Sequence, residues 1–370
     1  MIDILAIIIA PCVTLAVIRF LSPLALTLGL VDKPGGRKDH DGEVPLIGGI
    51  AMFAGLAVSL VFAPPPANVA VVIAAGLLLI IGVLDDYVFL SAYSRLLAQV
   101  SASLIVILVN DQYLLSLGSL FFDSAPFALG AAAIPFTIFS AVGVTNAMNM
   151  SDGMDGLAGG LTLVALVALA CVAGINGAPG QLTFLLAFIG VTIAFLAFNM
   201  RTPWRTRAQI FMGNGGSMFL GFAIAWLLIQ LTQGATPVMP PIVALWIFAV
   251  PLMDTVCIML RRISKGRSPF APDREHLHHV LLLAGYTVNQ TVWIMLAIAA
   301  LFAAGGVGAY YAGVPEFILT YLFLIIAAGY FWAMQRAWKV MKLLHRHLLA
   351  TAPPPVGMHA ARPVKRSTIK

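Results

Sequence analysis

Apolar stretches of about 20 residues recur along almost the whole chain, and this feature limits its fold more than any other. That length allows an α-helix to cross the hydrocarbon core of a bilayer. Only 10% of the 370 residues are charged and 61% are hydrophobic, whereas a soluble domain usually carries about 25% charged residues. The sequence therefore predicts one all-α polytopic membrane domain rather than two soluble domains.

The apolar runs predict about eleven transmembrane helices. Their boundaries are uncertain by about three residues, because hydropathy does not define helix ends sharply. The expected spans centre on residues 3–21, 45–63, 68–84, 96–110, 127–145, 157–175, 181–199, 211–231, 239–260, 291–312 and 316–335.

The connections between these spans alternate in charge. One kind is rich in Lys and Arg, and the other contains neither. The positive-inside rule makes the basic side cytoplasmic, which predicts a periplasmic N-terminus, a cytoplasmic C-terminus and residence in a bacterial inner membrane. The net charge of +6 follows from this topology and from attraction to anionic lipids, so it implies no nucleic-acid partner. The connections without Lys or Arg are 64–68, 110–126, 174–180, 232–240 and 312–316.

Two regions of unequal size are expected. Residues 1–338 would form the transmembrane domain. Residues 339–370 would form a basic cytoplasmic tail that begins as an interfacial helix and ends in a disordered segment.

The ionisable residues gather in the cytoplasmic connections and the basic tail, which together contain all seven histidines. A site that needs charge is therefore expected on that side. The first polar segment, residues 31–49, combines Lys33 with several glycines. The second is Asp85 and Asp86, whose adjacent carboxylates at a membrane boundary repel each other, so a divalent cation or a basic ligand would relieve both. The plainer readings are a solvated basic loop and a solvated helix end.

Three further segments complete the set. In residues 146–157, Asp152 and Asp155 are three positions apart, so they would share a face if the segment were helical, and Asn149 lies three residues before Asp152. Residues 211–217 form a glycine-rich turn that could offer backbone N–H groups to a phosphate, or simply be flexible. Residues 261–279 hold three histidines within four positions beside several cations, which suits a pyrophosphate or a metal. Zinc is a competing reading, although no cysteine accompanies these histidines.

Asp254 lies inside the expected span 239–260, seven residues before Arg261. On a straight helix that distance is about 10 Å, at about 1.5 Å per residue. The carboxylate would either orient an active-site group or pair structurally with a neighbouring helix, and we slightly favour the structural role.

In this order, the five segments resemble the polyprenyl-phosphate N-acetylhexosamine-1-phosphate transferase family, within it most closely the branch that uses N-acetylglucosamine 1-phosphate and undecaprenyl phosphate. The resemblance covers residues 30–285. The stretches that carry it are Val31–Pro34, Pro45–Gly49, Leu84–Asp86, Asn146–Leu157, Phe211–Gly213 and Ser268–His279.

The resemblance implies an enzyme in which a polyprenyl phosphate attacks the β-phosphorus of a UDP-sugar and UMP leaves, the first membrane step of a cell-surface polysaccharide pathway. It implies Mg²⁺ or Mn²⁺, a bilayer environment and an active site at the cytoplasmic face. A homodimer is compatible with this reading. The implied catalytic residues are Asp85, Asp86, Asp155 and His278; the implied substrate-binding residues are Lys33, Asn149, Asp152, Phe211, Arg274, His276 and His279; and the implied metal ligands are Asp86, Asp152 and Asn214.

Two positions depart from the family pattern. Asn214 stands where relatives usually carry a metal-binding aspartate, and Phe89 stands where many carry a third aspartate. An amide oxygen can still bind a hard cation, but it brings no negative charge. Asn214 therefore motivates one alternative, a non-catalytic paralogue that binds nucleotide sugar or lipid. A transporter or flippase is a further alternative, against which the placement of polar residues at one face argues.

Overall fold

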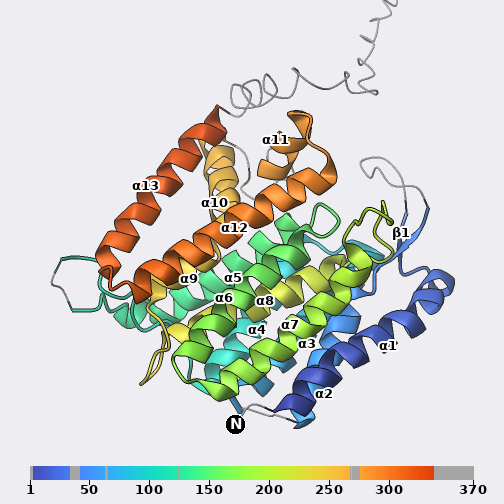
Figure 1. The fold of residues 1–370 in the computed structure, drawn as a ribbon, viewed down its shortest axis with the longest axis horizontal. Helices are drawn as coiled ribbons and strands as arrows, with labels where there is room; N and C mark the ends of the chain where they lie inside the picture. Colours follow the sequence, from blue (N-terminus) through green and yellow to red (C-terminus); the bar gives the residue numbers. More distant parts are fainter. Residues whose placement is uncertain are drawn as a thin grey trace, which may run out of the picture.

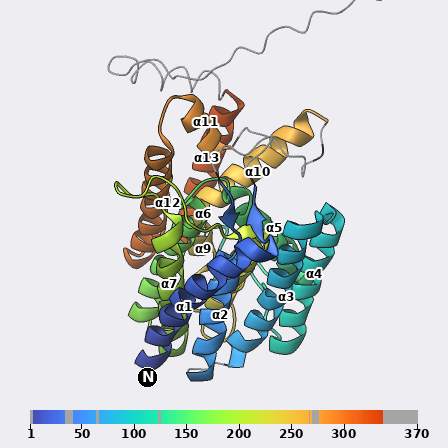
Figure 2. The same ribbon diagram turned by 90° about the vertical axis from the view of Figure 1, so that its right-hand side faces the viewer.

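The computed structural model describes residues 3–33, 42–62, 66–122, 125–266, 268 and 276–336. This part of the chain is mostly helical, and its long helices lie side by side in one bundle (Figures 1 and 2). Nine of the described helices are long and apolar enough to cross a membrane. The prediction of an all-helical polytopic membrane protein is therefore confirmed in its outline. The proposed tail, residues 339–370, lies outside the described residues.

The described elements are two strands, one 3₁₀ turn and thirteen α-helices. A two-stranded antiparallel ribbon places Val31 opposite Pro45, and a single 3₁₀ turn spans Gly130–Ala132. The strands are β1 (Val31–Asp32) and β2 (Val44–Pro45), and the helices are α1 (Ile4–Leu28), α2 (Gly48–Phe62), α3 (Pro66–Val88), α4 (Ala92–Asn110), α5 (Ala133–Ser151), α6 (Leu157–Ile175), α7 (Pro179–Asn199), α8 (Gly213–Thr232), α9 (Pro241–Ile247), α10 (Ala249–Ser264), α11 (Leu277–Leu283), α12 (Val288–Tyr311) and α13 (Glu316–Gln335).

Each of the eleven apolar segments expected from the sequence coincides with helix. The segment 45–63 is shorter than expected, since α2 has only 15 residues. At about 1.5 Å per residue this helix is shorter than a typical hydrocarbon core of about 30 Å. The number of crossings and the orientation of the termini remain predictions.

Helix α8 is the central helix, with 94% of its most apolar stretch buried inside the protein. Glycines let neighbouring backbones approach it closely, as small residues do in other membrane bundles. A Cβ on Gly49 of α2 would overlap Gly216, and a Cβ on Gly82 of α3 would overlap Gly215. The first turn of α8 is thereby held directly against the polar ends of α2 and α3.

The prediction that residues 239–260 form one straight helix is wrong. The segment consists of α9 and α10, which meet at Phe248 with a bend of 83°. Pro251 lies in the first turn of α10, where it has no N–H to continue the hydrogen bonds of α9 and its ring excludes the preceding turn. Asp254 and Arg261 both lie in α10, after the bend, so the helical distance of about 10 Å between them still applies, and the position of either residue relative to a membrane boundary stays a prediction.

Candidate active site

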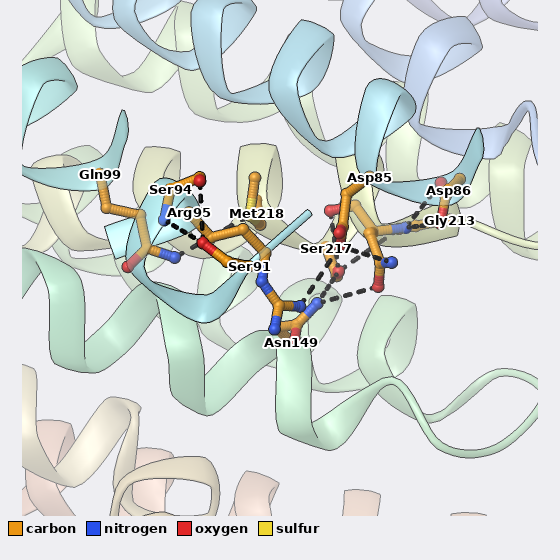
Figure 3. Close-up of polar contacts among 11 residues, drawn as sticks. Asp85, Asp86, Ser91, Ser94, Arg95, Gln99, Asn149, Gly213, Ser217 and Met218 are labelled. Carbon is orange, nitrogen blue, oxygen red and sulfur yellow. Dashed lines mark hydrogen bonds and ion pairs between the residues drawn. The ribbon is translucent and has the colours of Figure 1, made fainter. Parts of the chain in front are cut away.

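The aspartate pair lies in the last turn of α3, at the same end of the bundle as β1 and α11 (Figure 1). Asp85 is buried, and its Oδ2 accepts hydrogen bonds from Arg95 Nη1 at 3.2 Å and from Asn214 Nδ2 at 3.0 Å (Figure 3). Ser91 caps α4 by accepting the N–H of Ser94, which starts the helix one turn before Arg95. The charge of Asp85 is therefore compensated by a cation from α4.

Asp86 lies at the N-terminus of α8. Both of its carboxylate oxygens accept the backbone N–H of Asn214, at 3.2 and 3.0 Å. A helix N-terminus stabilises a carboxylate because its first N–H groups lack partners within the helix. Gly213 has a positive φ of 75°, and a Cβ there would lie 2.7 Å from Asp86 Oδ2. The glycine-rich turn thus gives one N–H group to Asp86, where the sequence suggested a phosphate.

The side-chain amide of Asn214 lies between an acceptor and a donor. Its Nδ2 donates to Asp85, while Asn149 Nδ2 lies 3.5 Å from its Oδ1. Asn149 also donates to Ser217 Oγ at 2.8 Å. These contacts join the end of α5 to the first turn of α8 (Figure 3). Sequence reasoning did not single out Ser217 or Arg95, because neither pairing is visible without the fold.

Asp152 follows α5 and faces two other acids. Burial raises its pKa to about 7, and the negative charges of Asp86 and Asp155 add to that effect. The residue is nevertheless exposed to solvent. The pKa is raised because the many protein atoms around the carboxylate still displace part of its water. Three carboxylates close enough to repel each other form a region of negative potential that a cation would relieve.

Asp155 anchors the loop after α5 to the connection between α7 and α8. Its Oδ2 accepts hydrogen bonds from Arg201 Nε at 2.7 Å and from the backbone N–H of Ala208 at 3.2 Å. The next N–H, that of Gly156, donates to Asn199 Oδ1 at 2.8 Å. These contacts fix the loop that carries Asp152, and the catalytic role expected for Asp155 stays a prediction.

The histidine segment lies against this loop. A Cβ on Gly153 would be 3.0 Å from His278 Nε2, so the imidazole packs directly over the glycine that follows Asp152. The ring of His278 lies 5.5 Å from that of His276 and 4.2 Å from that of His279. Burial, together with the neighbouring His279 and His276, lowers the pKa of His278 to about 3. His278 is therefore neutral near pH 7 and can act through hydrogen bonds but not as a cation.

Three further residues were expected to bind substrate. Phe211 joins two of the polar segments through its backbone, since its N–H donates to Pro45 O at 2.8 Å and its carbonyl accepts the N–H of Gly48 at 2.9 Å. Lys33 is exposed and forms an ion pair with Glu43 at 3.4 Å. Arg274 lies outside the described residues.

Within the described ranges, no group of three or more His, Cys, Asp or Glu is arranged to hold a metal ion. The zinc reading therefore gains no support there. A smaller oxygen set consists of Asp86, Asp152 and the amide oxygen of Asn214. Magnesium prefers oxygen ligands and is commonly bound by one or two carboxylates together with substrate phosphates. The mutual repulsion of the acids and the chemistry of these donors fit such a cation.

Comparison with known proteins finds one family model and several similar proteins. A family model described as glycosyl transferase family 4 matches residues 68–232, which include the acids and Asn214 but not the histidines. Three similar proteins are each described as an undecaprenyl-phosphate alpha-N-acetylglucosaminyl 1-phosphate transferase. The protein of Escherichia coli K12 is 38% identical, over 88% of this chain and 89% of its own length. The protein of Salmonella typhimurium is 36% identical, over 87% of this chain and 88% of its own length. The protein of Haemophilus influenzae is 34% identical, over 90% of this chain and 93% of its own length.

Proposed function

The chain belongs to glycosyl transferase family 4, as a relative of the undecaprenyl-phosphate alpha-N-acetylglucosaminyl 1-phosphate transferases, and on this premise we propose that it transfers a sugar 1-phosphate from a UDP-sugar to undecaprenyl phosphate. It is an enzyme, and the resemblance stated from its motifs is confirmed. The non-catalytic alternative gains no support from these relatives. The sugar we propose is N-acetylglucosamine, as in the names of the relatives.

The reaction exchanges one phosphorus–oxygen bond for another. An oxygen of the lipid phosphate bonds to the β-phosphorus of the UDP-sugar. The bond from that phosphorus to the bridging oxygen breaks, and UMP leaves with this oxygen. The bond between sugar and phosphate stays intact, so the product is an undecaprenyl diphosphate that carries the sugar. Such a transfer depends mainly on positioning and on neutralising phosphate charge.

One observation carries the proposal. Asp85, Asp86, Asn149 and Asn214 come from three helices distant in sequence, and hydrogen bonds join them at one end of the bundle. His278 lies against the loop after α5, over the glycine that follows Asp152. Acidic, amide and imidazole groups in one place suit a cation-bound diphosphate.

We propose that Asp86, Asp152 and the oxygen of Asn214 hold Mg²⁺ or Mn²⁺. When bound, the ion would neutralise the diphosphate and polarise the phosphorus–oxygen bonds. Asp85, oriented by Arg95 and Asn214, faces the lipid phosphate or supports the cation site. Neutral His278 contributes a hydrogen bond to substrate. Lys33, Phe211, Arg274, His276 and His279 remain proposed substrate contacts.

The test is direct transfer by the purified protein. UDP-sugar labelled in the sugar, undecaprenyl phosphate and Mg²⁺ should give lipid-extractable label and UMP in equal amounts. Asp152→Asn should lose most of this activity. Asp111→Asn, which changes an acid just after α4 and distant in sequence from every site segment, serves as the matched control. Absence of UMP with either metal, from folded protein, contradicts the proposal, whereas a panel of UDP-sugars identifies the donor.

We further propose eleven crossings in a bacterial inner membrane, a periplasmic N-terminus, a cytoplasmic C-terminus and a cytoplasmic active site. The support is the one-sided distribution of Lys and Arg among the connections. Single cysteines in a cysteine-free background test this orientation, because Thr236 and Ser268 are both exposed and lie in connections of opposite predicted side. An impermeant maleimide should label Thr236→Cys in spheroplasts and Ser268→Cys only after lysis. The reverse result contradicts the orientation.

A further inference from the structure

Asp254 of α10 is a buried carboxylate at the meeting point of three segments. It accepts hydrogen bonds from His276 Nδ1 at 2.7 Å, from the backbone N–H of Leu277 at 3.0 Å and from the Tyr330 hydroxyl at 2.6 Å. Asp254 and His276 are only 5% and 6% exposed. A buried polar group that lacks its partners is costly, so these bonds fix the start of α11 against α10 and α13.

The contact with His276 also fixes a chemical state. A carboxylate oxygen accepts but does not donate, so the proton of this hydrogen bond resides on Nδ1 of the imidazole. A carboxylate or carbonyl at one ring nitrogen is a common means of orienting a functional histidine. The tautomer and the ring plane of His276 are thereby set by Asp254.

From His276 the arrangement continues to the acids. The rings of His276 and His278 lie almost parallel, with an interplanar angle of 8° and centroids 5.5 Å apart. His278 packs over Gly153, next to Asp152. A displacement of His276 would therefore move His278 relative to the acidic loop.

We propose that Asp254 and Tyr330 are positioning residues of the transfer reaction: they orient His276 and, through its ring, hold His278 beside the loop of Asp152. This inference rests on the proposed function. It assigns a task to α13, whose sequence gives no sign of a role in the site, and it replaces the purely structural role that the sequence favoured for Asp254.

The test separates positioning from stability. Tyr330→Phe removes one hydrogen bond and keeps the ring, so we expect kcat to fall about tenfold, as for other partners that orient functional groups, while the KM for UDP-sugar changes less than twofold. Tyr321→Phe, an exposed tyrosine of the same helix, is the matched control. An unchanged kcat for Tyr330→Phe, with a lower melting temperature alone, would overturn the proposal.

A double-mutant cycle tests whether Asp254 acts through His276. Asp254→Asn should lower kcat about a hundredfold in the wild-type background, the scale expected when a reacting group is misplaced by about 1 Å. It should have little further effect in a His276→Gln background, because the group that it positions is already gone. Equal effects in both backgrounds would overturn the proposal. If Asp254→Asn does not fold, the Tyr330→Phe result decides.

Transfer by the wild-type protein is measured in the same preparation. Its absence would remove the proposed function itself. Normal transfer by the wild type, with effects of Asp254→Asn and His276→Gln on kcat that simply add, would contradict only the positioning role.

Discussion

Replacing Gly82 by alanine should separate Asp85 and Asp86 from the glycine-rich turn that carries Asn214, without changing any polar group. Gly82 lies on α3, less than one turn before Asp85, and a Cβ there would overlap Gly215 and lie 2.7 Å from the carbonyl carbon of Asn214. Ordinary carbon–carbon contacts are about 3.5–4.0 Å, so the two backbones must part by about 1 Å. Both sides of the contact are backbone, and no side chain can rotate away.

We expect this substitution to cost about 1–3 kcal/mol of unfolding free energy, the usual range for overpacking. Activity should fall more, by about a hundredfold, because a shift of about 1 Å at a reacting group has that scale of effect. The assay is the initial rate of UMP release at saturating substrates, with thermal unfolding of the same sample.

Two alanine variants serve as controls. On the same helix, the Cβ of Gly76→Ala would meet the ring of Phe53 at 2.8 Å, and a ring edge can move. Gly143→Ala on α5 would meet no atom within 4 Å. Both should keep most of their activity. If Gly82→Ala is as active as these controls, the close crossing of α3 and α8 does not set the geometry of the site.

Three other outcomes are expected. The pKa of Asp152 is about 7, and a cation must displace its proton. The affinity for Mn²⁺, measured by electron paramagnetic resonance, should therefore fall about tenfold per pH unit below pH 7 and level off above it. A constant affinity from pH 5.5 to 7 would contradict this. Asn214→Asp replaces the amide that donates to Asp85 at 3.0 Å by a second acid. In EDTA, thermal unfolding should therefore show a loss of roughly 1–3 kcal/mol of unfolding free energy, and Mg²⁺ should reduce this loss. Equal stability of the variant and the wild type in EDTA would argue against the hydrogen bond. Gly153→Ala should displace His278 and lower kcat roughly tenfold without lowering the melting temperature, and unchanged turnover would show that this contact is unimportant.

Hydropathy was sufficient to locate the membrane helices, because a span needs a minimum apolar length whatever its neighbours are. It could not reveal the bend at Phe248, since the residues on both sides are equally apolar and only Pro251 marks the break.

The site was predictable as a set of segments but not as a set of contacts. Asp85 and Asn214 stood out through their polarity beside apolar runs, yet their hydrogen bond joins residues 129 positions apart. From the sequence, Asn214 was interpreted only as the replacement of an aspartate that relatives usually carry. In the fold, its amide lies between the carboxylate of Asp85 and the amide of Asn149, and both contacts require a group that donates and accepts.

The order of the site along the chain also bears on its biosynthesis. The acids and amides of the aspartate–asparagine cluster lie before the end of α8, whereas the imidazoles follow α10 and the tyrosine that donates to Asp254 lies on α13. The ribosome therefore releases the half with these acids and amides first, and five more helices, α9 to α13, must follow before Tyr330 is in place. We expect a nascent chain to be inert toward its substrates until synthesis is nearly complete.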